Sequence, residues 1–117
     1  MTASAPGTTA SRPAVVDQQL ARATAALCRD HPAHATTVRG VLAPLRDRLR
    51  RLHQDCQAAD AAAWSAYTAD LDRGLAELEI EVARAAERTG GVEQVLGTAA
   101  TQFERRAEEL REETGQV

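Results

Sequence analysis

The residue types best suited to metal or redox chemistry, histidine and cysteine, occur only between residues 28 and 56. They form two groups, which consist of Cys28, His31 and His34 and of His53 and Cys56. Thiolate and imidazole are the usual protein ligands of zinc, and both spacings occur in metal sites. If residues 34 to 56 are helical, the two groups lie roughly 33 Å apart, so one chain cannot combine them in one site. A metal site would use one group alone, or one group from each chain of an antiparallel dimer.

Packing and solvation give these five residues a simpler role than metal binding. Cys56 falls at a core position of an apolar heptad seam, where a free cysteine behaves as a small hydrophobic residue. His31 and His34 flank Pro32, which is typical of polar residues in a connection between helices. Nothing near either thiol indicates a cysteine of low pKa. The sequence therefore predicts no cofactor, and a metal- or cofactor-binding helical bundle that uses these histidines and cysteines is the alternative.

Charged residues are divided unequally between the two halves of the chain. Residues 1–56 hold eight arginines and four aspartates, a net charge of +4, whereas residues 57–117 hold six arginines and thirteen acidic residues, a net charge of −7. We expect the two halves to attract each other within one bundle, and a basic surface for an acidic partner is the second interpretation. Because the whole chain is acidic and has only three aromatic residues, nucleic-acid binding is not expected.

Catalytic and membrane motifs are missing from the sequence. It has no Ser-His-Asp signature, no glycine-rich phosphate loop and no Glu-x-x-His pair, so we expect no enzymatic activity. Its longest apolar runs are four residues, far below the length of a membrane span. The N-terminal region has no apolar signal segment and two cysteines suggest no disulfide framework, so a cytoplasmic protein is expected. All fourteen basic residues are arginine, a bias typical of a GC-rich bacterial genome.

Four amphipathic segments predict four α-helices behind a disordered tail of residues 1–13. Apolar residues recur at alternating spacings of three and four, and β-branched and aromatic residues are sparse. The expected helices span about 14–30, 32–56, 60–89 and 92–113. Pro44 falls inside the second of them, where we expect a kink near residues 40–44 rather than an end. Trp64 falls on the seam of the third as a core anchor, and Tyr67 lies just off that seam.

The join between the second and third segments decides between two architectures. The apolar seam slips by one position between Cys56 and Trp64, and Asp60 is a suitable N-cap, so a turn before Asp60 gives a compact four-helix bundle. A continuous helix from 32 to 89 would be about 87 Å long and would leave a seam for a second subunit. We therefore predict an all-α four-helix bundle, a single domain over residues 14–117, with the elongated and dimerising form as the alternative.

The predicted function is that of a non-catalytic helical interaction or regulatory protein. Apolar heptad seams associate with other helices, and the charges that flank them set partner choice and orientation. The expected partner is a second copy in a homo-oligomer, most simply a dimer, or another helical protein. The residues predicted to form this interface are Leu45, Arg46, Arg48, Leu49, Arg50, Arg51, Trp64, Glu77, Glu79 and Glu81.

Overall fold

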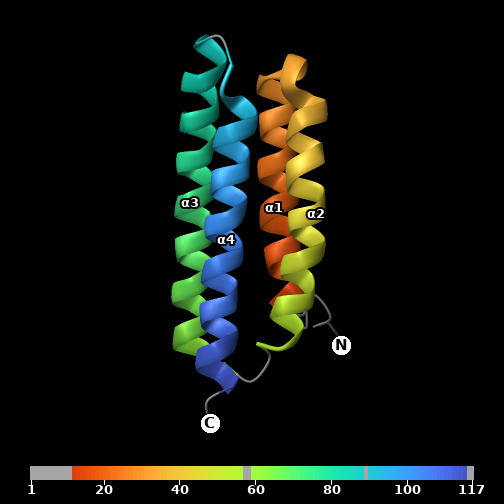
Figure 1. Ribbon diagram of the computed structural model, residues 1–117. Helices are drawn as coiled ribbons and strands as arrows, with labels where there is room; N and C mark the ends of the chain where they lie inside the picture. The colour runs from red at the N-terminus through yellow and green to blue at the C-terminus, as the bar shows by residue number, and fades with distance from the viewer. Residues whose placement is uncertain (1–11, 57–58, 89, 116–117) are drawn as a thin grey trace, which may run out of the picture.

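The computed structural model describes residues 12–56, 59–88 and 90–115, which form four α-helices and one short 3₁₀-helix (Figure 1). The elements in chain order are α1 (Arg12–Asp30), η2 (Pro32–His34), α2 (Ala35–Gln54), α3 (Ala61–Glu87) and α4 (Val92–Gly115). This described part of the chain contains no strand. The four α-helices pack against one another in one bundle, so the predicted all-α four-helix bundle is confirmed.

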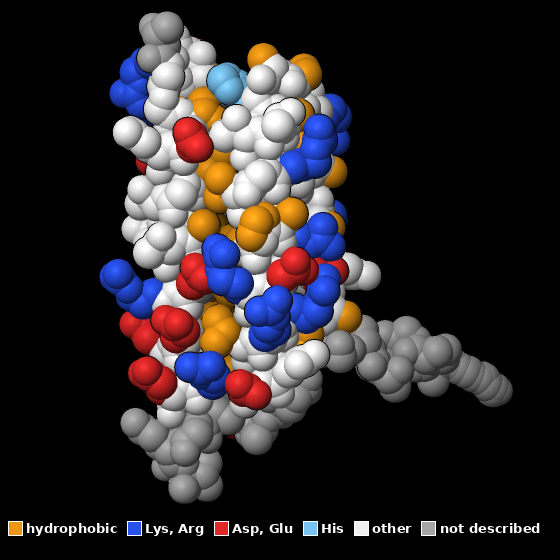
Figure 2. Space-filling model, turned by 45° about the vertical axis from the view of Figure 1, so that its right-hand side comes forward, with side chains coloured by type: hydrophobic (Ala, Val, Ile, Leu, Met, Phe, Trp, Pro, Cys, Tyr) orange, Lys and Arg blue, Asp and Glu red, His pale blue; other side chains and the backbone are white. Residues whose placement is uncertain are grey.

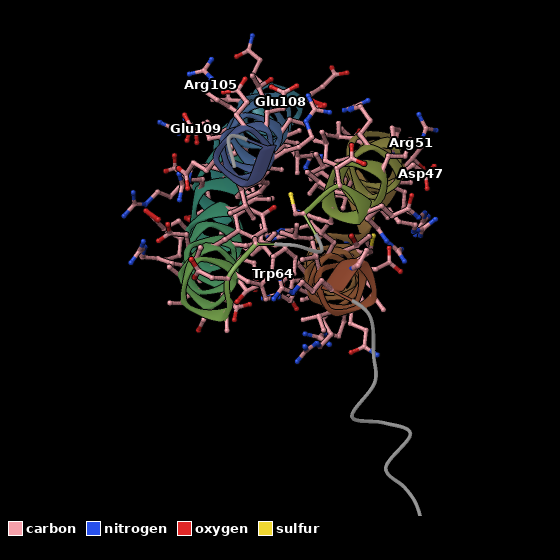
Figure 3. All side chains as sticks on the ribbon, turned by 90° about the horizontal axis from the view of Figure 1, so that it is seen from below. Asp47, Arg51, Trp64, Arg105, Glu108 and Glu109 are labelled. Atoms are coloured by element: carbon pink, nitrogen blue, oxygen red, sulfur yellow. The ribbon has the colours of Figure 1, made fainter. Side chains whose placement is uncertain are left out.

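The helices run alternately up and down the bundle as two antiparallel hairpins (Figure 1). α1 packs against α2 and α3 packs against α4, whereas between the hairpins α2 lies beside α4 and α1 lies beside α3. Seen from below, α2 and α3 occupy opposite corners (Figure 3), although they follow each other in the chain. The connection between them therefore crosses the end of the bundle along a diagonal. This crossing brings the last turn of α2 and the first turns of α3 together beneath the core.

The crossing interrupts the helix that the alternative architecture required. α2 ends at Gln54 and α3 begins at Ala61. The Asp60 carboxylate accepts a hydrogen bond of 2.7 Å from the backbone N–H of Ala63, which is the N-cap predicted from the sequence. An N-cap of this type stabilises a helix start by about 1 kcal/mol. The predicted turn before Asp60 is confirmed, and the elongated form with one helix from 32 to 89 is wrong.

Helix ends differ from their predicted positions by a few residues. α1 begins at Arg12, inside the predicted tail, and residues 1–11 of that tail lie outside the described residues. Pro13 is buried in the first turn of α1, where the missing N–H of proline needs no partner. The 3₁₀-helix η2 precedes α2, and α2 continues through Pro44, which is exposed and does not end the helix.

The turn between α3 and α4 depends on glycine. The backbone φ angle is +100° at Gly90 and +101° at Gly91. Glycine adopts positive φ without the steric penalty that a β-carbon brings. The two glycines therefore let the chain reverse direction within a few residues.

The core consists of aliphatic stripes that the four helices turn toward one another. Burial of one leucine or valine side chain contributes about 1.5–3 kcal/mol to stability. The residues at this core are spaced by three and four along each helix, as the seams predicted. Its fully or nearly buried aliphatic members include Val16, Leu20, Leu27, Val38, Leu42, Leu45, Leu49, Leu71, Leu75, Leu78, Val82 and Leu96.

Two core positions near the crossing differ from the predicted seams. Tyr67 is 3% exposed, whereas Trp64, which the sequence predicted as the anchor, is half-buried. His53 is fully buried, whereas its neighbour Leu52, which lies four residues before Cys56 on the same predicted seam, is half-buried. A strict heptad drifts by about 20° per seven residues around a straight α-helix. After two heptads of α2 the buried position has therefore moved from Leu52 toward His53.

Candidate functional site

A buried aromatic cluster lies where the α2–α3 connection crosses the bundle. The Nε2 atom of His53 and the hydroxyl oxygen of Tyr67 are 2.6 Å apart and share a hydrogen bond that joins α2 to α3. The His53 ring meets Trp64 edge-on, with ring centroids 5.3 Å apart and planes at 86°. The centroids of Trp64 and Tyr67 are 5.5 Å apart. Three side chains that the sequence assigned to different roles therefore form one packed unit.

Burial keeps this cluster uncharged. Removal from water lowers the pKa of His53 to about 4 and raises the pKa of Tyr67 far above its ordinary value of 10.0. At neutral pH the imidazole is therefore neutral and the phenol is protonated. The second ring nitrogen of His53, Nδ1, is buried and has no hydrogen-bond partner among the described residues. A neutral, fully buried imidazole packed by aromatic rings is suited to a structural role.

Arg12, the first residue of α1, binds the connection between α2 and α3. Its guanidinium donates hydrogen bonds to the backbone oxygens of Cys56, at 3.1 Å, and of Ala59, at 2.7 Å. The same group lies 5.2 Å from the ring centroid of Trp64, which is a cation–π distance. The Cys56 thiol is buried and donates to the Leu52 backbone oxygen, and burial raises its pKa. The predicted core position of Cys56 is confirmed.

The other histidine and cysteine group lies at the opposite end of the bundle (Figure 1), as the helical spacing predicted. Cys28 is half-buried, with its sulfur 3.8 Å from the Ala35 backbone oxygen and 3.6 Å from the Arg39 guanidinium. His31 and His34 lie in the connection from α1 to α2 and are half-buried. Within the described residues, no three His, Cys, Asp or Glu side chains are grouped so that they could hold a metal ion.

The arginines of α2 form their ion pairs within the bundle. Arg46 makes a bidentate contact with Asp17 at 2.9 and 3.1 Å, and this hydrogen bonding lowers the pKa of Asp17. Arg50 reaches the same carboxylate at 3.0 Å, and Arg48 pairs with Glu104 of α4. Figure 2 shows arginine side chains from the upper to the lower part of the view, and in its lower half acidic side chains lie beside them. Of these three arginines, Arg48 therefore pairs with the acidic half of the chain, and the other two pair with α1.

The remaining residues of the predicted interface are distributed between core and surface. Leu45 and Leu49 are fully buried in the core of the single chain and present no surface to another molecule. Arg51 is exposed and projects with Asp47 from the outer side of α2 (Figure 3). On α4, the labelled charged side chains of Figure 3 likewise point outward. The three glutamates of the prediction, Glu77, Glu79 and Glu81, lie on α3, away from the arginines of α2.

Sequence reasoning missed a groove between α3 and α4, which has a volume of about 860 Å³. Its floor includes short or flat side chains, among them Ala85, Ala99 and Phe103. Ile80 lines it as well and is 53% exposed, more than any other large hydrophobic side chain of the described residues. The signal that could have revealed it is the position of Ile80 outside the leucine seam of its segment. The charged rim on α3 consists of Glu77, Glu81, Arg84 and Arg88.

Gly74 shapes the lower end of this groove. A β-carbon at Gly74 would lie 2.6 Å from the Cε1 atom of Phe103, which is closer than atoms can approach. The missing side chain therefore lets the Phe103 ring pack directly against α3. A smaller hollow of about 280 Å³ continues from Gly74 toward Arg106, so the groove follows most of the α3–α4 pair.

No protein-family model matches this chain, and neither the curated proteins nor the solved structures compared with it give a match. Among the helices that the structure describes, none combines the length and the apolar character that a membrane crossing requires. The physical properties of the α3–α4 groove and of the buried His53 cluster are therefore the basis for any functional conclusion.

Proposed function

We propose that this protein is a non-catalytic helical interaction module, which binds another helical surface through the α3–α4 groove. The observation that carries the proposal is Ile80, whose side chain is more than half exposed at the edge of a groove with an apolar floor. Isolated exposed hydrophobic residues are common on monomers, but Ile80 lies at the edge of a groove between two helices, a kind of surface in which partner helices dock. An amphipathic helix fits such a groove by inserting apolar side chains spaced by three and four residues.

The chemistry of the other candidate residues supports a role without catalysis. The His53 imidazole is neutral and buried, and the Cys56 thiol is buried with a raised pKa, so neither group is poised for proton transfer or nucleophilic attack. As part of the same proposal we place the protein in the cytoplasm. Cys28 and Cys56 are free thiols at opposite ends of the bundle, which suits a reducing compartment.

The proposal is tested by photocrosslinking in the cells that make the protein. A photoreactive amino acid replaces Ile80, and illuminated adducts are identified by mass spectrometry. We expect one dominant adduct, with a second copy or with one other helical protein. The matched control carries the photoreactive residue at Val15 of α1, which is the other exposed large hydrophobic residue in the described part of the chain and is 37% exposed. If position 80 gives no more adduct than position 15, the α3–α4 groove is not a docking site and the proposal is wrong.

A further inference from the structure

The α3 rim of the groove carries its charges in a fixed order along the helix. Glu77, Glu81, Arg84 and Arg88 are spaced by four, three and four residues, so they follow one face, with the acidic pair first. Glu81 and Arg84 approach each other at 3.8 Å, with both side chains more than half exposed. Among the described residues, Glu77 and Arg88 have no ion pair. Two of the four rim charges are therefore left for another molecule, and the other two form a long and exposed pair that contributes little within the chain.

This order of charges is complementary to itself under a two-fold rotation. If a second α3 runs antiparallel to the first and is centred between Glu81 and Arg84, Glu81 of each chain faces Arg84 of the other. In the same arrangement Glu77 of each chain faces Arg88 of the other. Within one chain these two residues are roughly 16 Å apart along the helix axis, so the charged stretch has that length. A second α3 that runs parallel and in register would instead place like charges opposite each other. The charges therefore select the antiparallel orientation.

Apolar residues at the centre of this stretch suit the same arrangement. Ile80 lies less than one helical turn from the rotation axis, on the side of α3 that faces away from the core. Ala76 and Ala83 flank it on the outer face of α3, where Ala76 is exposed and Ala83 is half-buried. Short side chains allow two helices to approach closely, because interaxial distance depends on the side chains at the contact. A partner α3 can therefore bring its own Ile80 to the groove.

We propose that the protein forms a symmetric homodimer in which two α3 helices pack antiparallel across the α3–α4 grooves. This inference rests on the proposed function and names a second copy of the chain as the partner. Each Ile80 packs into the groove of the other chain, and four Glu–Arg pairs across the interface fix the register. A contact of this kind is isologous, so each chain contributes the same patch and the assembly closes at two copies.

The test is a charge swap, measured on the full chain by analytical ultracentrifugation at low ionic strength, where screening is weak. The variant E77R/E81R carries four arginines on the rim, and R84E/R88E carries four glutamates. Each variant alone is expected to dimerise roughly tenfold more weakly than the wild type, or worse. An equimolar mixture of the two, and the variant E77R/E81R/R84E/R88E alone, are expected to recover dimerisation. Circular dichroism verifies that every variant keeps the helix content of the wild type.

Recovery in the mixture and in the fourfold variant supports the proposal. A wild type that sediments as a monomer over its whole soluble range overturns it, and so does a dimer that both double variants retain. Loss of the dimer without recovery in the mixture also overturns it, because the rim charges would then not face each other. A monomeric wild type that still gives an adduct of position 80 with another protein leaves the proposed function standing, so the two failures are distinguishable.

Discussion

The imidazole Nε2 atom of His53 and the hydroxyl oxygen of Tyr67 lie 2.6 Å apart, and they join two helices that occupy opposite corners of the bundle. The contact forms because the chain crosses the bundle diagonally and brings the first turns of α3 to the same end of the bundle as the last turn of α2. His53 is fully removed from water in this position, and Tyr67 is almost fully buried. The protonation and the hydrogen bond of this pair are therefore coupled to folding.

Lowering the pH from about 6.5 to about 4 is expected to destabilise the protein through His53. Its pKa is about 4 in the folded chain and about 6.5 when exposed, so the unfolded state binds the proton first. The His53 contribution is complete above pH 6.5, falls by at most about 1.4 kcal/mol per pH unit, and is lost by about pH 4. Urea unfolding at several pH values measures this slope.

The variant H53Q is expected to remove most of that slope, whereas H31Q/H34Q, with changes at the opposite end of the bundle, keeps it. A wild-type unfolding free energy that stays constant between pH 6.5 and 4 would show that the buried imidazole accepts a proton as readily as a free one.

Removal of the Tyr67 hydroxyl is expected to leave the His53 imidazole without any hydrogen-bond partner. Its Nδ1 atom is already unpartnered among the described residues, and Nε2 would join it in Y67F. An unsatisfied buried polar group costs about 1–3 kcal/mol. In H53L/Y67F both partners are apolar, so a double-mutant cycle is expected to show that the two changes are not additive. Additive free energies of unfolding would mean that the 2.6 Å contact contributes nothing to stability.

The packing of Phe103 against Gly74 predicts that G74A destabilises the protein. The added β-carbon would lie 2.6 Å from the ring, and overpacking of this kind typically costs about 1–3 kcal/mol. G97A is the matched control, because Gly97 lies inside α4 and a β-carbon there meets nothing within 4 Å. Alanine is a better helix former than glycine, so G97A is expected to gain roughly 0.5–1 kcal/mol. Thermal unfolding of both variants checks the opposite signs, and a shift in the same direction would contradict the explanation.

Substitution of Arg12 is expected to loosen the α2–α3 connection. R12A removes the two hydrogen bonds to Cys56 and Ala59 and the cation–π contact with Trp64, with an expected loss of about 1.5–3 kcal/mol. The control R22A changes an exposed arginine of the same helix and is expected to stay within about 0.5 kcal/mol of the wild type. Unfolding in urea compares the two. Faster hydrogen exchange of the Ala59 amide, which donates to Cys56, is the local readout.

The helices and their buried faces were predictable because three-four spacing of leucine and valine determines which side of a helix leaves water. Asp60 was predictable because an aspartate before a run of alanines is a strong N-cap. Which helices pack against each other was not predictable, because a heptad seam shows which face of a helix is buried but not which helix covers that face. The burial of His53 depends on the diagonal crossing and on the drift of the seam along α2, and neither is a property of its local sequence.

The α3–α4 groove could not be predicted, because it depends on the volumes of side chains on two neighbouring helices and not on the spacing of apolar residues along one helix. The sequence shows Ala85, Ala99 and Gly74 as ordinary members of helical segments. They line a hollow only because α3 and α4 are neighbours, which places these small residues at several points along the same groove. Ile80 was visible as an apolar residue off the seam. Its place at the edge of a groove depends on α4, which packs against α3 and supplies the other wall of that groove.

The packing of α1 against α2 and of α3 against α4 makes each half of the chain an antiparallel pair of helices. The chain could therefore be made as two separate polypeptides, residues 12–56 and residues 59–115. Each polypeptide would contain both helices of one hairpin. Their reassembly needs no threading of one fragment through the other, because neither hairpin encloses the other. The protein could therefore be split between its two hairpins. A split reporter attached to the two fragments would give a signal when they associate.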